Sequence, residues 1–333
     1  MRRGGVILPF FLGGCSGVQT MLGGEGAEGA NFIQLFTVFM IVCTVMYLIV
    51  AIALIAAVWR RRNAALTLDN RRHHESSSAV RPALIGWTAL IAVGLIGLTV
   101  ASFFTDRSNA ANGNSPQLSL TVTVNQWWWD VEYNSPDASK TVRTANEIHL
   151  PVGVPVEVKL KSNDVIHSFW IPNLAGKQDL IPGRETDAQL LPRKTGLYRG
   201  QCAEFCGMQH AHMAFDVIAE SQADFDRWLS AMRRPASPPA TPETEHGREV
   251  FDSARCAGCH AVEGTGAAGL LGPNLTHIAT RSTLGAGTLA NTPEHLAAWI
   301  RDPQTIKPGN QMPANPMSDA DLQALVAYLE TLR

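Results

Sequence analysis

The chain has 333 residues, and its 27 Lys and Arg against 29 Asp and Glu give a formal net charge of −2, so charge gives no reason to expect nucleic-acid binding. This length allows two or three domains. Hydrophobic side chains make up 46% of the residues, and their uneven distribution along the chain indicates membrane-spanning parts as well as globular ones.

The first residues have the layout of a signal peptide. Two arginines are followed by a short apolar run and by Leu12-Gly13-Gly14-Cys15. The small residues before Cys15 also resemble a bacterial lipobox, in which the cysteine is lipidated and becomes the new N-terminus. Residues 1–15 are therefore expected to be a signal peptide with a lipobox, and ordinary cleavage or retention of the segment is the alternative.

Two long apolar runs follow. Residues 32–59 and 82–105 contain no Asp, Glu, Lys, Arg or His, and each is longer than the roughly 20 residues that cross a hydrocarbon core. Two such runs in one chain favour a transmembrane helical hairpin over residues 32–105, rather than buried core helices. The connection between them carries Arg60, Arg61, Arg62, Arg71, Arg72 and Arg81. Because positive residues stay on the cytoplasmic side, we expect a bacterial cell-membrane protein whose N-terminus and C-terminal domains lie on the periplasmic or outer face.

From residue 118 the sequence changes to short runs rich in Val, Ile, Thr and aromatic residues, such as "LSLTVTV" and "VPVEVKLKS". Several of these runs alternate apolar with polar residues, which predicts an all-β sandwich or barrel over residues 118–232. A helical period appears only near 222–232. The prolines of "RRPASPPATPE" then predict an extended linker over residues 233–243.

The stretch "QCAEFCGMQHAHM" (201–213) brings together potential metal ligands: Cys202, Cys206, His210 and Met213. His167, in "NDVIHSFWIP", can supply a further imidazole from an earlier strand. A mononuclear blue-copper site needs one thiolate, two imidazoles and a weak thioether, so this set has one thiolate too many.

Two thiolates can bridge two copper ions, with His167 and His210 as terminal ligands and with Met213 and the backbone carbonyl of Glu204 as weak ligands. A structural zinc held by two Cys and two His is the alternative, but it gives Met213 no role. His212 breaks the four-residue spacing and is expected to be an ordinary polar side chain.

This ligand set resembles the CuA centre of cytochrome c oxidase subunit II, which has a helical hairpin and a cupredoxin fold. The resemblance covers residues 30–232. It implies that Trp127, in "QWWW" (126–129), receives electrons near the copper, and that "KQDLIPGR" (177–184) faces subunit I. It also implies that the Glu204 carboxylate binds a magnesium ion shared with subunit I.

After the linker, Cys256-Ala257-Gly258-Cys259-His260 is the attachment motif of a c-type haem, with two thioethers and His260 as the proximal iron ligand. A helix over about 243–255, "GPNL" (272–275) and the closing "SDADLQALVAYLETLR" fit an all-α cytochrome c domain over residues 244–333. A distal methionine is usual for such a haem. Met312, followed by Pro313, resembles the Met-Pro loop of cytochromes c, whereas Met317, His277 and His295 are the alternative ligands.

The chain as a whole thus resembles subunit II of a haem–copper cytochrome c oxidase with a fused cytochrome c domain. The resemblance implies that electrons pass from haem c to CuA and on to subunit I, where oxygen is reduced and protons are pumped. Subunit III, membrane lipid and an upstream donor, either a cytochrome c or a bc-type complex, are the other expected partners.

Three other classes of protein are alternatives to this interpretation. A CuA protein of the nitrous-oxide reductase type would need a large soluble catalytic domain. A quinol oxidase subunit would lack the copper ligands. A stand-alone redox carrier or copper-delivery protein is the alternative that is not an enzyme.

Overall fold

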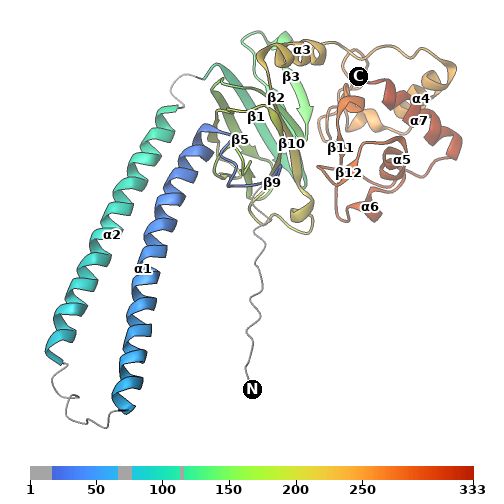
Figure 1. Ribbon diagram of the computed structural model, residues 1–333. Helices are drawn as coiled ribbons and strands as arrows, with labels where there is room; N and C mark the ends of the chain where they lie inside the picture. Colours follow the sequence, from blue (N-terminus) through green and yellow to red (C-terminus); the bar gives the residue numbers. More distant parts are fainter. Residues whose placement is uncertain (1–16, 67–76, 113–115) are drawn as a thin grey trace. The chain divides into compact units, whose positions relative to one another are not determined.

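The computed structural model describes residues 17–66, 77–112 and 116–333 (Figure 1). The predicted signal peptide with Cys15, and Arg71 and Arg72 of the predicted cytoplasmic loop, lie outside these residues. Ala30–Ala111 form one compact unit, and the remaining described residues form another.

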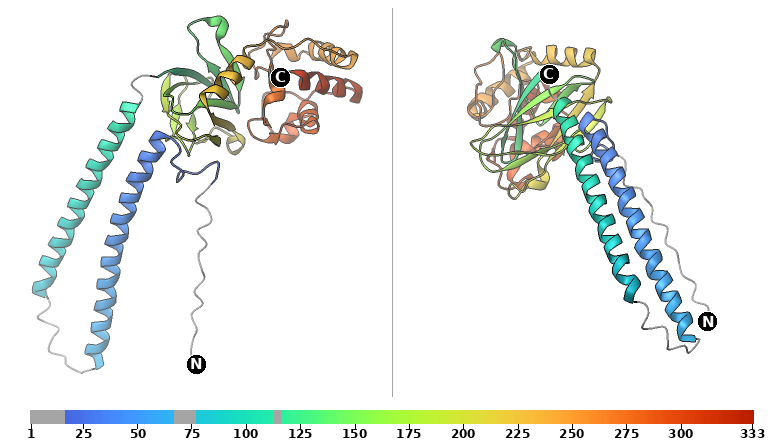
Figure 2. Two further views of the ribbon diagram at one scale, coloured as in Figure 1. Left: turned by 45° about the horizontal axis from the view of Figure 1, so that its top comes forward. Right: turned by 90° about the vertical axis from the view of Figure 1, so that its left-hand side faces the viewer.

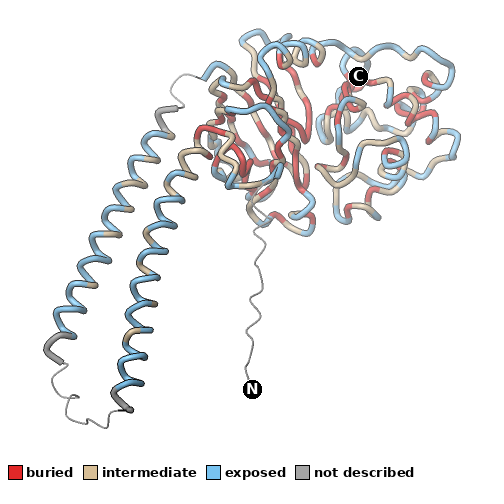
Figure 3. The backbone as a smooth tube through the Cα atoms, in the orientation of Figure 1, coloured by how far each residue is buried: buried red, intermediate tan, exposed pale blue. Residues whose placement is uncertain are grey.

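The first unit is a pair of helices, α1 (Ala27–Leu66) and α2 (Ser77–Asn112), which run in opposite directions (Figures 1 and 2). Within them, Ala27–Asn63 and Val80–Asn109 are long and apolar enough to cross a membrane, and each contains an 18-residue window of high mean hydropathy, 3.0 in the first and 2.2 in the second. Their side chains are exposed along most of both helices (Figure 3). Exposing so many apolar side chains to water is unfavourable, so these helices are suited to a lipid bilayer.

The second unit contains a β-sandwich of two five-stranded sheets. The first sheet has the order β3 (Val142–Ala145), β2 (Trp128–Tyr133), β1 (Leu118–Asn125), β5 (Val156–Ser162), β8 (Thr186–Leu190). The second has the order β4 (Glu147–Pro151), β10 (Ala214–Glu220), β9 (Gly196–Cys202), β6 (His167–Trp170), β7 (Gln178–Leu180). Both sheets are mixed, because β1 pairs with β5 in parallel and β4 pairs with β10 in parallel.

The alternating sequence pattern explains the core of the sandwich. Along β1, Leu120, Val122 and Val124 are fully buried, whereas the residues between them are half-buried. Trp129 of β2 reaches the facing sheet, where its ring centroid lies 4.7 Å from that of Phe215. A strand whose every second side chain is apolar can bury one face against a second sheet, as Figure 3 shows for these strands.

Residues 17–26 pack against the sandwich ahead of α1. The backbone N–H groups of Glu25 and Gly26 donate to the Asn173 carbonyl at 3.0 and 3.2 Å, and that of Thr20 donates to Asn173 Oδ1 at 2.9 Å. Gly26 has no space for a side chain, because a Cβ there would lie 2.2 Å from the Leu174 carbonyl oxygen. This segment therefore belongs to the sandwich although it precedes the helices in the chain.

The C-terminal domain contains the helices α4 (Pro242–Ser253), α5 (Pro293–Arg301), α6 (Pro303–Ile306) and α7 (Asp319–Thr331) and the short hairpin β11 (Thr283–Leu284) and β12 (Leu289–Ala290). Helix α4 begins one residue before the predicted start, because Thr241 and Thr244 form a capping box around Pro242. Its Gly247 lets the α7 backbone approach closely, since a Cβ there would lie 1.9 Å from the Ala324 carbonyl oxygen. The predicted fold class is confirmed: a helical hairpin, a cupredoxin-like sandwich and a helical cytochrome c domain.

The predicted linker follows helix α3 (Gln222–Met232), which is capped by Ser221 and lies at the end of the sandwich. One residue of this linker contacts the C-terminal domain. The backbone N–H of Ala236 donates to the Glu263 carbonyl at 2.8 Å, and His277 Nε2 contacts the Met232 carbonyl at 3.1 Å. Only residues 233–235 therefore separate these two points of contact with the C-terminal domain.

Candidate metal and haem sites

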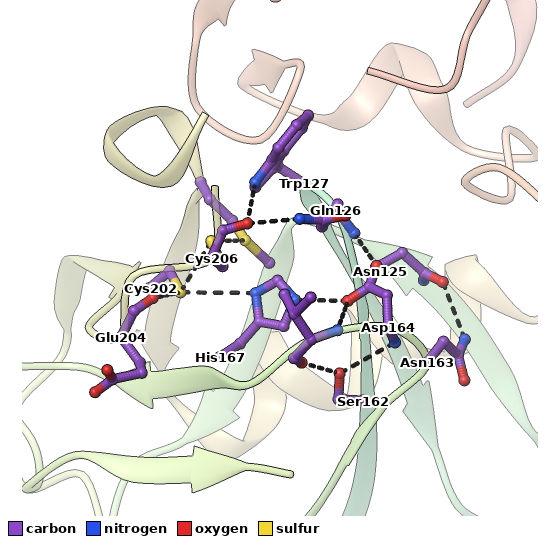
Figure 4. A network of polar contacts seen from close by, with 12 residues as sticks. Asn125, Gln126, Trp127, Ser162, Asn163, Asp164, His167, Cys202, Glu204 and Cys206 are labelled. Atoms are coloured by element: carbon purple, nitrogen blue, oxygen red, sulfur yellow. Dashed lines mark hydrogen bonds and ion pairs between the residues drawn. The ribbon is translucent and has the colours of Figure 1, made fainter. Parts of the chain in front are cut away.

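The metal-ligand candidates meet where β6 and β9 pair. Phe169 lies opposite Cys202 in this pair, so His167 at the start of β6 is brought close to Cys202 at the end of β9. The loop that leaves β9 returns at Met213, whose carbonyl accepts from the Cys202 N–H at 2.9 Å. This hydrogen bond brings the two ends of the loop together, and Cys202, Cys206 and His167 lie close to one another in Figure 4.

The sulfur and nitrogen atoms of these residues lie at the separations of metal ligands. Cys202 Sγ is 3.7 Å from both His167 Nδ1 and Cys206 Sγ. Cys206 Sγ is 3.6 Å from His210 Nδ1 and 3.8 Å from Met213 Sδ. Two ligands bonded to one tetrahedral ion at 2.0–2.3 Å lie about 3.3–3.8 Å apart, whereas a disulfide requires about 2.05 Å. The cysteines are therefore spaced for metal binding and not for a disulfide.

The electrostatics of the two thiols also favour a cation. His167, Cys202, Cys206 and Met213 are buried. A hydrogen bond from the Cys206 thiol lowers the pKa of Cys202 to about 3, and the same contact raises the pKa of Cys206. One thiolate thus forms readily, but a second beside it needs positive charge, which a bound metal ion supplies.

The ligand count exceeds that of a structural zinc site. Besides two thiolates and two imidazoles, the buried Met213 thioether lies against Cys206, and the Glu204 carbonyl oxygen lies 3.2 Å from Cys202 Sγ. Six donors are more than the four of tetrahedral zinc and suit two ions. His212 has a different neighbour, because its Nδ1 contacts Gln209 Oε1 at 2.9 Å.

Asp164 is a site residue that the sequence analysis missed. Its Oδ1 lies 2.8 Å from His167 Nε2, and its Oδ2 accepts from the Gln126 N–H at 2.5 Å (Figure 4). The carboxylate holds a proton on Nε2 of His167 and leaves Nδ1 free to bind a metal on the side of Cys202. The sequence feature that could have pointed to Asp164 is its position three residues before the candidate ligand His167.

Trp127 lies directly beside the metal loop. Its Nε1 donates to the Cys206 carbonyl at 2.9 Å, and Gln126 Nε2 donates to the same oxygen at 2.7 Å. The Trp127 side chain is buried. Trp127 is therefore separated from Cys206 by a single hydrogen bond.

The Glu204 carboxylate has a different neighbour from its carbonyl group. It points away from the cysteine sulfurs (Figure 4), and its Oε2 lies 3.6 Å from Lys177 Nζ, with both side chains about half exposed. Lys177 begins the segment 177–184 that was predicted to face another subunit. The described residues therefore present this carboxylate at the surface of the sandwich.

The haem-attachment motif adopts a tight turn. The His260 N–H donates to the Cys256 carbonyl at 2.9 Å, and His260 Nδ1 contacts the Pro273 carbonyl at 2.8 Å, which leaves Nε2 free for iron. Burial lowers the pKa of His260, so its imidazole is neutral, as a ligand must be. Gly272 lies against this ring, since a Cβ there would be 2.6 Å from His260 Cε1. The motif thus fits a covalent haem c.

The rival histidines have ring nitrogens that contact backbone carbonyls. His277 Nε2 contacts Met232 at 3.1 Å, and His295 Nδ1 contacts Ala290 at 2.9 Å. Met312 is half-buried, and its carbonyl accepts from Gln304 Nε2 at 2.8 Å. Met317 lines a separate cavity of about 620 Å³ beside α4, whose lining includes neither the haem cysteines nor His260.

Comparisons with known proteins follow this division into domains. The profile of the family described as cytochrome C oxidase subunit II, periplasmic domain, matches residues 135–220, and that of cytochrome c matches residues 244–333. The protein of Alkalihalophilus pseudofirmus named cytochrome c oxidase subunit 2 is 34% identical over 333 residues, covering 98% of this chain and 95% of its own length. Its namesake in Bacillus subtilis is 34% identical over 227 residues, covering 65% of this chain and 62% of its own.

Two solved structures are similar to single domains. The periplasmic domain of subunit II of cytochrome oxidase (CoxB) of Bradyrhizobium japonicum has 29% identity and a TM-score of 0.34, covering 36% of this chain and 96% of that one. The c-type cytochrome SorU of Sinorhizobium meliloti has 24% identity and a TM-score of 0.21, covering 27% of this chain and 90% of that one.

Proposed function

The chain belongs to the cytochrome c oxidase subunit II family and is a subunit of an oxidoreductase, and from this premise we propose that it passes electrons from a covalent haem c through a dinuclear CuA centre to subunit I. The observation that carries the proposal is a set of six donors, made of two cysteine sulfurs 3.7 Å apart and four further donors around them. A mononuclear blue-copper site has no use for the second thiolate, and a four-coordinate zinc site has none for Met213.

When bound, two copper ions and one haem would supply one-electron redox chemistry. In this proposal the two ions would be held by Cys202, Cys206, His167 and His210. Met213 and the Glu204 carbonyl are the weak ligands. The buried sandwich holds these side chains rigidly, so they need to move little when an electron arrives. Cys256, Cys259, His260 and Met312 hold the haem.

The remaining proposals concern partners and location. Oxygen reduction and proton pumping belong to subunit I, because the two apolar helices carry no Asp, Glu, Lys, Arg or His within residues 32–59 and 82–105. The exposed Glu204 carboxylate is available to a magnesium ion shared with that subunit. A cytochrome c or a bc-type complex delivers electrons, and subunit III completes the assembly. The helices anchor the chain in a bacterial cell membrane with both redox domains on the periplasmic or outer face.

Metal analysis of the purified membrane complex tests the copper proposal. Two copper ions per chain and a delocalised mixed-valence electron paramagnetic resonance signal are expected. Cys202→Ser or Cys206→Ser should abolish the signal and oxidase turnover, whereas Cys43→Ser, in the apolar helix α1, should change neither. One zinc and no copper in active protein would refute the proposal. Purification of an active chain without subunit I would instead favour a stand-alone electron carrier.

A further inference from the structure

Lys307 is the one buried lysine in the described part of the chain, with 2% of its surface exposed. Its Nζ donates to the carbonyls of Trp127, His212 and Gly285 at 2.9, 2.7 and 2.7 Å. A lysine ammonium has three N–H donors, so all of them are used. Burial lowers the pKa of Lys307 to about 7, and the protonated form alone has three donors to offer.

The three carbonyls come from two domains. Trp127 and His212 belong to the sandwich, Trp127 beside the metal loop and His212 within it, and Gly285 belongs to the β11–β12 turn of the haem domain. Lys307 itself precedes the proposed iron ligand Met312 by five residues. The Lys307 side chain of the haem domain thus contacts the backbone of Trp127 and the backbone of the copper loop at His212.

Neighbouring contacts continue this interface. The Ala214 N–H at the start of β10 donates to the Ala286 carbonyl at 3.0 Å, and Gln209 Nε2 donates to the Pro308 carbonyl at 2.9 Å. At Gly309, a Cβ would lie 2.8 Å from Met208 Cε and 3.6 Å from the Trp127 ring. The segment around Lys307 therefore covers Trp127, which is 7% exposed.

We infer that Lys307 is the positioning residue that seats the fused cytochrome c domain on the copper loop, over Trp127. This inference rests on the proposed function, because the contacts around Lys307 would hold the two domains in place for electron transfer from haem c to CuA. It also means that Trp127 receives electrons from the fused domain and not from a separate protein.

The chemistry of the contact explains why a lysine occupies this position. Burying an ammonium is costly unless every donor finds an acceptor, so the side chain is stable here only when both domains are in register. An apolar residue would add contact area between the domains but would not fix their relative orientation. Both domains carry an excess of acidic residues, 14 against 10 basic residues over 118–232 and 9 against 6 over 244–333, so long-range attraction does not orient them.

The test uses the full chain in its purified complex and compares Lys307→Met with wild type. Lys307→Met keeps a long, unbranched side chain and removes all three donors. Hydrogen exchange of backbone amides in 207–214 and 284–290 should accelerate about tenfold or more. Haem-to-copper electron transfer after photoreduction of the haem should slow about tenfold or more. The copper and haem content should be unchanged, and Lys307→Arg should recover part of both losses.

Lys161→Met is the matched control, because Lys161 is a half-exposed lysine of β5 that pairs with Glu185. It should behave like wild type in every measurement. Equal exchange and equal transfer rates in Lys307→Met and Lys161→Met would overturn the inference while leaving the proposed function intact. A wild-type chain that contains copper and haem but shows no transfer between them would overturn the proposed function instead.

A second measurement needs no variant and covers the case in which Lys307→Met does not fold. In the wild-type complex, an amine-reactive reagent followed by mass spectrometry should modify Lys307 about tenfold more slowly than Lys161. Equal modification of the two lysines would show that the seated arrangement is not populated, and the inference would fall.

Discussion

Asp164 decides which nitrogen of His167 faces the proposed copper. Its two oxygens serve three groups, the His167 ring and the backbone N–H groups of Val165 and Gln126. An imidazole that binds metal through one nitrogen is held in place by the partner of the other nitrogen. Asp164 also connects the ligand to Gln126, and so to the strand end that carries Trp127.

The Asp164→Asn change should therefore weaken copper binding. Its amide group is isosteric, but it cannot accept from both the imidazole and the Gln126 N–H. Loss of such a partner usually costs about 10–100-fold in metal affinity, and we expect a loss in this range from copper titration of the metal-free complex. Asp187→Asn, at an exposed position of β8, is the control. Equal affinities in the two variants would show that Asp164 does not orient the ligand.

The proposed iron ligand can be identified by a pair of methionine variants. Met312→Ala should lower the haem reduction potential and remove the sulfur-to-iron charge-transfer band of the oxidised protein, because a thioether favours reduced iron. Met317→Ala should leave both unchanged, since the cavity that Met317 lines includes neither the haem cysteines nor His260. Redox titration and visible absorption spectra measure the two effects. The reverse result would assign the ligand to Met317.

At the scale of elements, α3 is joined to the sandwich through His149 of β4. The His149 ring stacks on Trp228 with centroids 4.0 Å apart, and its Nδ1 lies 2.8 Å from Glu220 Oε1 of β10. Burial lowers the pKa of His149 to about 4. The folded chain therefore favours neutral His149, and this preference contributes stability in full above an unfolded-state pKa of about 6.5.

This contribution should disappear as the pH falls from about 6.5 to about 4. It amounts to about 3 kcal/mol of unfolding free energy, which is seen as a fall in the melting temperature of the sandwich. His149→Phe keeps a ring against Trp228 but cannot be protonated, so its stability should change less over this range. Burial raises the pKa of Glu220, which acts in the opposite direction, so the two proteins are compared at each pH.

The exposed His246, paired with Asp321, provides the control for this experiment. His246→Phe should retain the pH dependence of wild type. Identical pH profiles for His149→Phe and wild type would contradict a role for His149 in acid sensitivity.

At the scale of the whole molecule, the short linker keeps the two redox domains together. In polyproline geometry residues 235–243 could span about 28 Å, but the contacts of Ala236 and Met232 with the haem domain leave much less free chain. Such a tether maintains an effective concentration on the order of millimolar. The two domains can then re-form the contacts around Lys307 after they separate, without long-range attraction between them.

Electron transfer from haem c to CuA should therefore be independent of protein concentration and nearly independent of salt. Cutting a protease site introduced at Ser237 should make the rate fall on dilution, and the uncut form of the same variant is the control. Stopped-flow or flash measurements at several dilutions test this. An unchanged rate in the dilute cut protein, or strong slowing of the intact protein by salt, would contradict this explanation of the fusion.

The sequence alone predicted the features that depend on neighbouring residues or on ligand chemistry. The apolar spans, the strand-rich region, the cysteines and histidines of 202–213 and the haem motif 256–260 are local patterns with strong physical preferences. Their chemistry also pointed to His167, because a second imidazole was needed. These predictions required no knowledge of which distant residues meet.

Only the tertiary structure showed how these parts are held. The sequence does not reveal that Asp164 orients His167, that His149 is buried against α3, or that Ala236 contacts the haem domain. Lys307 looks like any surface lysine in the sequence, yet its ammonium reaches a carbonyl 180 residues earlier in the chain. The physical reason is that the stability of a buried charge depends on all the acceptors that folding brings around it, and backbone carbonyls, which every residue has, leave no pattern in the sequence.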